Sequence, residues 1–334
     1  MSDKMAEATH SQFDYSRPVD LSGEVEPLFR ALVNTFAFRR LADVRFLGGI
    51  DYFLVPTPNG ARTNTRYTRY QHSLGVARLA LYYADVVGLP ERVRRLGYAA
   101  ALLHDVGHAP LSHSLEPLFE EAFDLNHHHV TRRIITGDTH LGKDVLHVLL
   151  AHHINPGDVL SVIAGDVDPF GGLFSGPINF DTVEGILRAR SYITPKSSSP
   201  GPIDVVRAAI LRSTPTDRQI VDSFWHCKDV VYRHIIRSRN GILTDHLCQA
   251  VARERLHALT KRDLLSTEHS LFRKIPKLRS ALARRHHIES QVQGTVQFIS
   301  RRFYVDDNCD FFAKEDRNRY RQSRWSETIA AVEF

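Results

Sequence analysis

The sequence predicts an all-α protein with a small β element near its C-terminus. Apolar residues recur at helical spacing along most of the 334 residues. Alternation typical of a strand or hairpin appears near the end, over residues 291–305. A composition of 43% hydrophobic and 24% charged residues is that of a folded globular chain. No apolar run approaches the roughly 20 residues that cross a bilayer, so we expect no membrane partner.

Glycine and proline divide the helical pattern into successive segments. Residues 1–22 are polar and predict a flexible N-terminal arm. Gly88 and Pro90 end one helix, and Gly107 ends the next, whose apolar stretch GYAAALL indicates burial. The expected helices cover about 24–47, 67–87, 90–105, 112–124, 127–136, 141–153, 181–193, 204–239, 243–259 and 264–285. A short strand is expected at 50–57, and a loop-rich crossing at 155–179.

The charge distribution indicates possible binding partners, and the cysteine content indicates the cellular compartment. Residues 201–334 hold 24 Lys and Arg against 16 Asp and Glu, a net charge of +8, although the whole chain carries only +5. This basic third can steer polyanions such as nucleic acid, and a solvated helical face is the alternative. The three cysteines lack CxxC spacing, which argues against a disulfide framework or a cysteine zinc site and favours the cytoplasm.

Histidine is concentrated in one part of the chain. Of the 19 histidines, 11 lie between His72 and His153. Histidine is the commonest metal ligand and titrates near neutral pH. The concentration therefore suggests a polar site that holds a metal, with scattered surface histidines as the alternative.

Within this region the string HDVGHAPLSHSLE begins at His104 and Asp105, where a very apolar helix ends. A buried imidazole and carboxylate are costly unless they are paired or bound to a metal. Gly107 then breaks the helix, which lets His108 and His113 turn back toward the same site. A hydrogen-bonded pair at the helix end is the simpler alternative.

Three segments, TRYQHSLGVARLA, AALLHDVGHAPLSHSLE and SGPINFDTVEGILRA, resemble in order and spacing the HD superfamily of metal-dependent phosphohydrolases. The most similar branch is the deoxynucleoside triphosphate triphosphohydrolases, and the similarity spans roughly residues 28–285. The resemblance implies an HD-domain helical bundle as the core over 23–195. A helical extension over 196–285 would pack on it, and residues 286–334 would form a small C-terminal α/β tail.

The resemblance also implies roles for particular residues. The metal ligands would be His72, His104, Asp105 and Asp181. Two imidazoles and two carboxylates suit a divalent transition metal such as Fe, Mn, Ni, Co or Zn, with Mg as an option beside it. The catalytic groups would be His108, His113, His127 and Glu116. The substrate-binding groups would be Arg69, Arg188 and His128, and the choice among His127, His128 and His129 for proton transfer stays open.

The segment after Asp181 departs from the branch that it resembles. A phosphate-binding cation is replaced by Thr182, a nucleotide-packing tyrosine by Gly185 and a sugar-reading acid by Ala189, while Arg188 is retained. These losses weaken the case for selective recognition of a deoxyribonucleotide. They leave the case for a metal-bound phosphate intact.

We therefore expect a metal-dependent phosphohydrolase. Its substrates would be (deoxy)nucleoside triphosphates, split into nucleoside and triphosphate by a metal-activated water. One alternative is a phosphodiesterase, nuclease or nucleotide phosphatase that acts on another phosphate ester. Another is a non-catalytic module that binds nucleotide or nucleic acid. A cytoplasmic homo-oligomer is the expected state.

Overall fold

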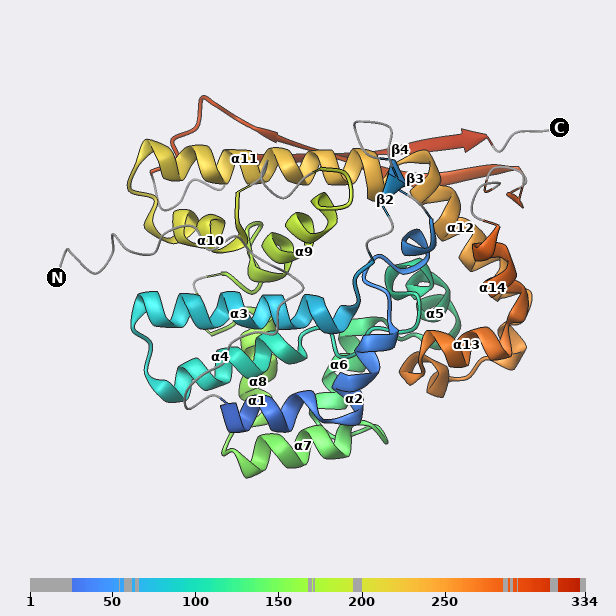
Figure 1. The fold of residues 1–334 in the computed structure, drawn as a ribbon, viewed down its shortest axis with the longest axis horizontal. Helices are drawn as coiled ribbons and strands as arrows, with labels where there is room; N and C mark the ends of the chain where they lie inside the picture. Colours follow the sequence, from blue (N-terminus) through green and yellow to red (C-terminus); the bar gives the residue numbers. More distant parts are fainter. Residues whose placement is uncertain are drawn as a thin grey trace.

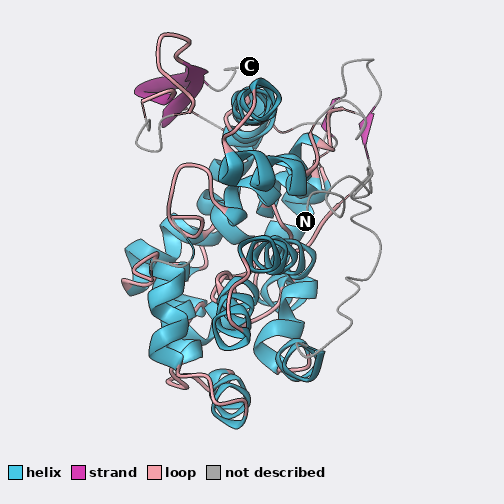
Figure 2. Ribbon diagram, turned by 90° about the vertical axis from the view of Figure 1, so that its left-hand side faces the viewer, coloured by secondary structure: helices cyan, strands magenta, loops and turns pink. Residues whose placement is uncertain are grey.

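A computed structural model describes residues 26–53, 55–56, 62–63, 66–167, 170, 172–194, 200–284, 288, 291–292, 294–312 and 318–330. Helices make up most of this part of the chain, and one long β-hairpin lies along one side of the helical body (Figures 1 and 2). The predicted all-α class with a β element near the C-terminus is therefore confirmed. The predicted N-terminal arm, residues 1–22, lies outside the described residues.

The centre of the fold is a pair of packed helices, α3 (Arg69–Val87) and α4 (Glu91–Leu103). The Thr68 side chain caps the start of α3 in a reciprocal arrangement with Gln71, and Gly88 ends the helix with a left-handed backbone at φ 71°. Helix α9 (Phe180–Arg190) packs against α3, and α8 (Pro156–Ala164) packs against α4. This layer places the ends of α3, α4 and α9 at one site.

Shorter elements surround this pair. On the N-terminal side they are α1 (Glu26–Val33), α2 (Phe36–Arg39), the 3₁₀ turns η1 (Arg40–Asp43) and η2 (Gly48–Tyr52), and the two-residue strands β1 (Val55–Pro56) and β2 (Arg62–Thr63). After α4 come the 3₁₀ turn η3 (Ser112–Ser114) and the helices α5 (Glu116–Phe123), α6 (His127–Ile135) and α7 (Gly142–Ala151).

The remaining helices and the hairpin form the other side of the body. They are α10 (Pro202–Leu211), α11 (Pro215–Val231), the π-helical turn η6 (Tyr232–Ile236), α12 (Arg239–Arg253), the 3₁₀ turns η7 (Leu256–Ala258) and η8 (Lys261–Leu265), α13 (Glu268–Lys274) and α14 (Pro276–Ala283). The antiparallel strands β3 (Thr295–Val305) and β4 (Tyr320–Ala330) pair from Thr295↔Ala330 to Val305↔Tyr320. Helix α11 packs against α9 on one side and β3 on the other, so it links the hairpin to the centre.

Several predicted elements differ from the structure. The helix expected over 24–47 is divided because Thr35 caps a new helix, α2. Among the described residues of the strand expected at 50–57, residues 50–52 belong to the 3₁₀ turn η2 and residues 55–56 form β1. The expected helix over 204–239 breaks where Thr214 caps α11 and Pro215 opens it. The crossing at 155–179 contains a helix, α8, because Asn155 caps a segment that begins with Pro156.

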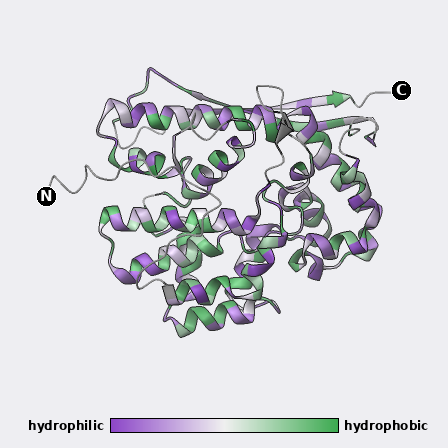
Figure 3. Ribbon diagram, in the orientation of Figure 1, coloured by the Kyte–Doolittle hydropathy of each residue, from purple (hydrophilic) through white to green (hydrophobic). Residues whose placement is uncertain are grey.

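The buried apolar residues form one continuous core. It joins Leu28 of α1, Leu79 of α3, Trp225 of α11 and Phe303 of β3. Apolar and polar residues alternate around the helices, as expected when one face of each is buried (Figure 3). The predicted units 23–195, 196–285 and 286–334 therefore share a core, and their boundaries stay a proposal. Among the described helices, none is both long and apolar enough to cross a bilayer.

Candidate metal centre

The first predicted ligand, His72, lies one turn into α3 and is fully buried. Its Nε2 atom lies 3.0 Å from Oδ1 of Asp181 and 3.5 Å from Oδ2 of Asp105. Asp181 is the second residue of α9, where the Asn179 side chain caps the helix. The packing of α3 against α9 therefore brings together residues that are 109 positions apart.

His104 and Asp105 directly follow the last residue of α4. Nδ1 of His104 donates a hydrogen bond of 2.8 Å to the carbonyl oxygen of Ala101, which leaves Nε2 as the free acceptor of the ring. This Nε2 atom is buried without a hydrogen-bond partner. It lies 3.4 Å from Oδ2 of Asp105 and 3.9 Å from Oδ1 of Asp181.

These four side chains fit a divalent metal. Two ligand atoms at right angles, each about 2.1 Å from one ion, are about 3.0 Å apart, which is close to the 3.0–3.9 Å that separates the donor atoms here. Two imidazole nitrogens and two carboxylate oxygens form a ligand set for a mid-row transition metal. The unpartnered Nε2 of His104 gives the ion a ready ligand.

A buried carboxylate supports His72 from behind. Nδ1 of His72 lies 2.5 Å from Oε2 of Glu184, and Nε of Arg188 donates to Oε1 of the same carboxylate over 2.9 Å. A carboxylate on the far nitrogen of a metal-binding histidine fixes the ring and raises its basicity. Gly75 makes room for Glu184, because a Cβ atom at position 75 would lie 2.3 Å from Oε1.

Arg69 supports the other carboxylate ligand. Its Nη1 atom lies 2.7 Å from Oδ2 of Asp105, and its Nε donates to the Ser112 hydroxyl over 3.1 Å. Burial alone would raise the pKa of the Asp105 carboxyl, but two neighbouring histidines and Arg69 hold it well below its usual range. Arg69 is itself buried. It was predicted to contact substrate, and in this structure it holds a predicted metal ligand.

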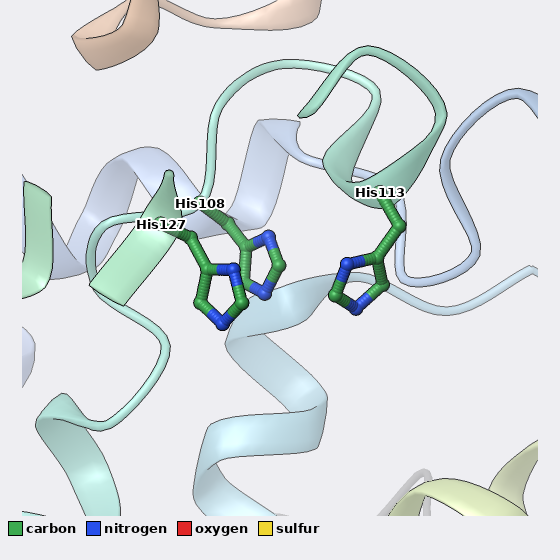
Figure 4. A group of neighbouring side chains, drawn as sticks. All are labelled: His108, His113 and His127. Atoms are coloured by element: carbon green, nitrogen blue, oxygen red, sulfur yellow. The ribbon is translucent and has the colours of Figure 1, made fainter. Parts of the chain in front are cut away.

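A second group of histidines lies beside the metal centre (Figure 4). His108 lies in the turn after α4, His113 in η3 and His127 at the start of α6. The rings of His108 and His127 are stacked with centroids 4.1 Å apart. One nitrogen from each of the three rings lies within 4.8 Å of the others, so the group can hold an ion or an anionic oxygen.

Glu116 fixes two of these rings. One carboxylate oxygen lies 2.8 Å from Nδ1 of His113, and the other contacts both the ring Nδ1 and the backbone N–H of His127. Burial would raise the pKa of Glu116, but the hydrogen bonds from His113 and His127 hold it well below its usual range. With Nδ1 of both rings held, Nε2 of each is the atom left for a ligand.

His108 connects the two groups. Its Nε2 lies 3.3 Å from Oδ1 of Asp105, and the ring is buried. Burial holds the pKa of His108 well below its usual range, so the ring is neutral at physiological pH.

The two remaining predicted substrate groups, His128 and Arg188, have different surroundings. His128 is exposed, and its ring lies against that of His127, with centroids 3.9 Å apart. Arg188 is buried against Glu184, away from an open position for substrate. The structure thus brings the predicted metal and catalytic residues to one place and gives Arg188 a supporting position.

Sequence reasoning missed Glu184 and Gly75. The signal for Glu184 was its position three residues after Asp181, which puts both carboxylates on one face of α9. Only the packing of α3 on α9 explains Gly75. Sequence reasoning also gave no role to Lys228 of α11, whose pKa is raised by the charge of Asp181.

Comparisons with known proteins indicate the family to which the chain is related. Residues 69–168 match the sequence model described as the HD domain. YwfO of Bacillus subtilis, an uncharacterized protein, is 36% identical over 244 residues, which is 66% of this chain and 51% of that protein. Human deoxynucleoside triphosphate triphosphohydrolase SAMHD1 is 35% identical over 103 residues, which is 29% of this chain and 15% of that protein.

The crystal structure of a hypothetical protein from Aquifex aeolicus has a similar fold, with a TM-score of 0.61 at 17% identity over 86% of each chain. The chain spans about half or less of the length of the curated relatives that it matches. The resemblance to HD phosphohydrolases is confirmed. The matched region contains His72, His104 and Asp105, and ends before Asp181.

Proposed function

Residues 69–168 form an HD domain, and from this premise we propose that the protein is a metal-dependent phosphohydrolase that acts on nucleoside triphosphates. One observation carries the proposal. Donor atoms of His72, His104 and Asp181 lie within 4.8 Å of one another. The carboxylate of Asp105 lies within 3.5 Å of both histidines, and it joins them to a second group of imidazoles through His108, 3.3 Å away. Such a pairing can hold the reacting phosphate between a metal and proton-carrying groups.

We assign a separate role in the reaction to each group of residues. His72, His104, Asp105 and Asp181 would hold the ion, which when bound neutralises phosphate charge and lowers the pKa of water. His108, neutral because it is buried, can donate one hydrogen bond to a phosphate oxygen. His113 and His127, with Nδ1 held by Glu116, present Nε2 toward the substrate, and His127 would hold the proton for the leaving oxygen. Arg69 and Arg188 act through Asp105 and Glu184.

The nucleotide is proposed from the relatives and from Gly185. Human SAMHD1, which is 35% identical over 103 residues, is named a deoxynucleoside triphosphate triphosphohydrolase. A Cβ atom at Gly185 would meet Phe46 at 3.4 Å and His72 at 3.6 Å, both ordinary contacts. A methyl group would therefore fit at this position, and the glycine itself offers a nucleoside no ring on which to stack. We accordingly propose weak selection among bases and sugars.

The experiment assays the purified full chain against ribo- and deoxynucleoside triphosphates, with Mn²⁺, Fe²⁺, Co²⁺, Ni²⁺, Zn²⁺ or Mg²⁺ added separately. We expect release of nucleoside and triphosphate, lost in His104→Ala and retained in Glu254→Gln, an exposed change far in sequence from the ligands. Metal content and thermal unfolding of each variant show whether it folds. Absence of turnover with every nucleotide and metal would reject the function.

A phosphodiesterase or nuclease acting on single-stranded nucleic acid is the second candidate. The observation that favours it is the basic region of residues 201–334, with a net charge of +8. Faster cleavage of a single-stranded oligonucleotide than of mononucleotides would select this candidate.

The three cysteines, free in the structure, support a reducing compartment and hence the proposed cytoplasmic location. Assembly into homo-oligomers stays a prediction.

A further inference from the structure

A lysine from outside the HD domain lies close to the metal centre. Lys228 is on α11, which packs along α9, the helix that carries Asp181. Its Nζ atom lies 4.5 Å from the ring centre of Trp225 and 4.8 Å from that of Phe303. Burial lowers the pKa of Lys228 to about 8, and the charge of Asp181 opposes this shift. The ammonium group therefore lies over two neighbouring aromatic rings and within electrostatic reach of a predicted metal ligand.

Two arginines join this lysine. Arg301 lies two residues before Phe303 on β3, so it shares the face whose ring covers Lys228. Arg237 follows η6, which packs against β3. The charge of Arg301 lowers the pKa of both Lys228 and Arg237, so Arg301 lies within electrostatic reach of each of the other two cations. We call Lys228, Arg237 and Arg301 the hairpin cation cluster.

The cluster has little compensating negative charge. Among the described residues, none forms an ion pair or a side-chain hydrogen bond with any of the three, and the Nε atoms of Arg237 and Arg301 are buried without an acceptor. The acids whose charge raises the pKa of cluster members are Asp181, for Lys228, and Asp245, for Arg237. Gathering like charges in a half-buried place is unfavourable unless an anion joins them.

Other arginines near the hairpin are satisfied. Arg302 lies 3.1 Å from Asp229, Arg319 lies 2.6 Å from Asp222 and Arg321 lies 2.8 Å from Asp306. Arg302 is the direct neighbour of Arg301, and its side chain projects from the opposite face of β3. The lack of partners is therefore a property of the cluster and not of arginines on this hairpin in general.

We propose that the hairpin cation cluster binds a phosphate group of the substrate, beside the phosphate that reacts at the metal centre. The proposal rests on the phosphohydrolase function above and adds a part that lies outside the HD domain, the β3–β4 hairpin. Guanidinium groups suit phosphate oxygens because their N–H groups can form paired hydrogen bonds. The phosphate can belong to a nucleoside triphosphate or to the backbone of a single-stranded oligonucleotide, since both carry several phosphates in a row.

The test compares two charge-equivalent variants of the full chain, Arg301→Gln and Arg302→Gln. Binding of inorganic tripolyphosphate is measured by calorimetry, which needs no turnover. We expect Arg301→Gln to weaken binding about tenfold or more, because one charged hydrogen-bonding group is lost. Arg302→Gln should change it less than about twofold. Equal effects of the two variants, or no effect of either, would overturn the proposal.

A second measurement guards against a folding defect in Arg301→Gln. In a Trp325→Phe background the emission comes from Trp225, the ring that Lys228 covers, so tripolyphosphate binding should change it. The conservative variant Arg301→Lys should restore part of the affinity. An unchanged emission at saturating tripolyphosphate would contradict binding at this cluster.

Enzyme kinetics show whether the cluster binds a nucleotide or an oligonucleotide, and they test this inference separately from the proposed function. A rise in KM for nucleoside triphosphates in Arg301→Gln, with a single-stranded oligonucleotide unaffected, assigns the cluster to the nucleotide, and the reverse result assigns it to the oligonucleotide. If native protein hydrolyses nucleotides but Arg301→Gln binds tripolyphosphate with native affinity, this inference fails and the proposed function stands. If tripolyphosphate binding depends on Arg301 but no phosphate ester is hydrolysed, the function fails and the binding site stands.

Discussion

Nδ1 of His72 lies 2.5 Å from Oε2 of Glu184, and Arg188 contacts the same carboxylate. All three side chains are buried. The ion pair between Arg188 and Glu184 compensates both charges, and Glu184 in turn requires a proton on Nδ1 of His72. This requirement leaves Nε2 of His72 with a lone pair that faces Asp105 and Asp181. Glu184 does not face the proposed metal position, but it fixes the protonation of His72, which does.

Glu184→Gln should weaken metal binding. The amide removes the negative charge that raises the basicity of His72, and it leaves Arg188 without its ion-pair partner. We expect the dissociation constant for Mn²⁺ to rise by about 10- to 100-fold, as measured by competition with a chelator. Glu254→Gln, which removes an exposed carboxylate paired with Lys277, serves as the control. Equal metal affinity in both variants would contradict the role given to Glu184.

Gly75→Ala should have a similar effect without touching a charged group. The added Cβ atom would lie 2.3 Å from Oε1 of the buried Glu184, which must then move away from His72. The matched change Gly185→Ala adds a methyl group beside the same histidine at 3.6 Å, an ordinary contact. Metal content and thermal unfolding should fall in Gly75→Ala and stay near native values in Gly185→Ala. The opposite order would show that crowding at Glu184 does not control the site.

The resemblance to the HD superfamily implied His72, His104 and Asp105 as metal ligands, and the structure brings these side chains together. Their role as ligands stays a prediction. The structure also brings Asp181 to them, although the HD domain match ends earlier. Helix breaks were harder to predict, because the cap at Thr214 outweighs an apolar pattern that continues on both sides.

Contacts between distant segments could not be predicted from spacing. Glu184 supports His72 only because α9 packs on α3. Phe303 contacts Lys228 only because the hairpin packs on α11, and no periodicity along either segment indicates that packing. Charge counting found the basic C-terminal third, but it could not separate unpaired Arg301 from paired Arg302.

Glu116→Gln should reduce turnover more than metal binding. The native carboxylate accepts hydrogen bonds from His113 and His127, and an amide can accept at only one of its two ends. At least one imidazole then loses its fixed orientation and tautomer. We expect kcat to fall by about 10- to 100-fold, which is part of what a positioned acid or base contributes. Metal content should not change. A normal kcat, or loss of metal together with activity, would contradict this division.

Glu268 is the first residue of α13, and its carboxylate is buried. It accepts hydrogen bonds from the backbone N–H groups of Arg45, at 2.7 Å, and Leu111, at 3.3 Å. Leu111 has a left-handed backbone at φ 62°, in the turn that joins His108 to His113. Contact with Glu268 thus holds a strained turn in place from a distant segment. Burial raises the pKa of Glu268 from 4.5 to about 7, more than its hydrogen bonds lower it.

A raised pKa in the folded state means that the folded protein binds this proton more tightly than the unfolded chain does. The stabilisation is therefore complete below about pH 4.5 and is lost as the pH rises through 7. In Glu268→Gln the amide oxygen can still accept from Arg45 and Leu111, and no buried charge forms. We expect the free energy of unfolding, measured by urea titration between pH 5 and 8, to fall less with pH in this variant than in the native protein. Glu254→Gln should follow the native profile. If Glu268→Gln shows the native pH dependence, the carboxyl of Glu268 does not titrate in this range, and its hydrogen bonds outweigh its burial.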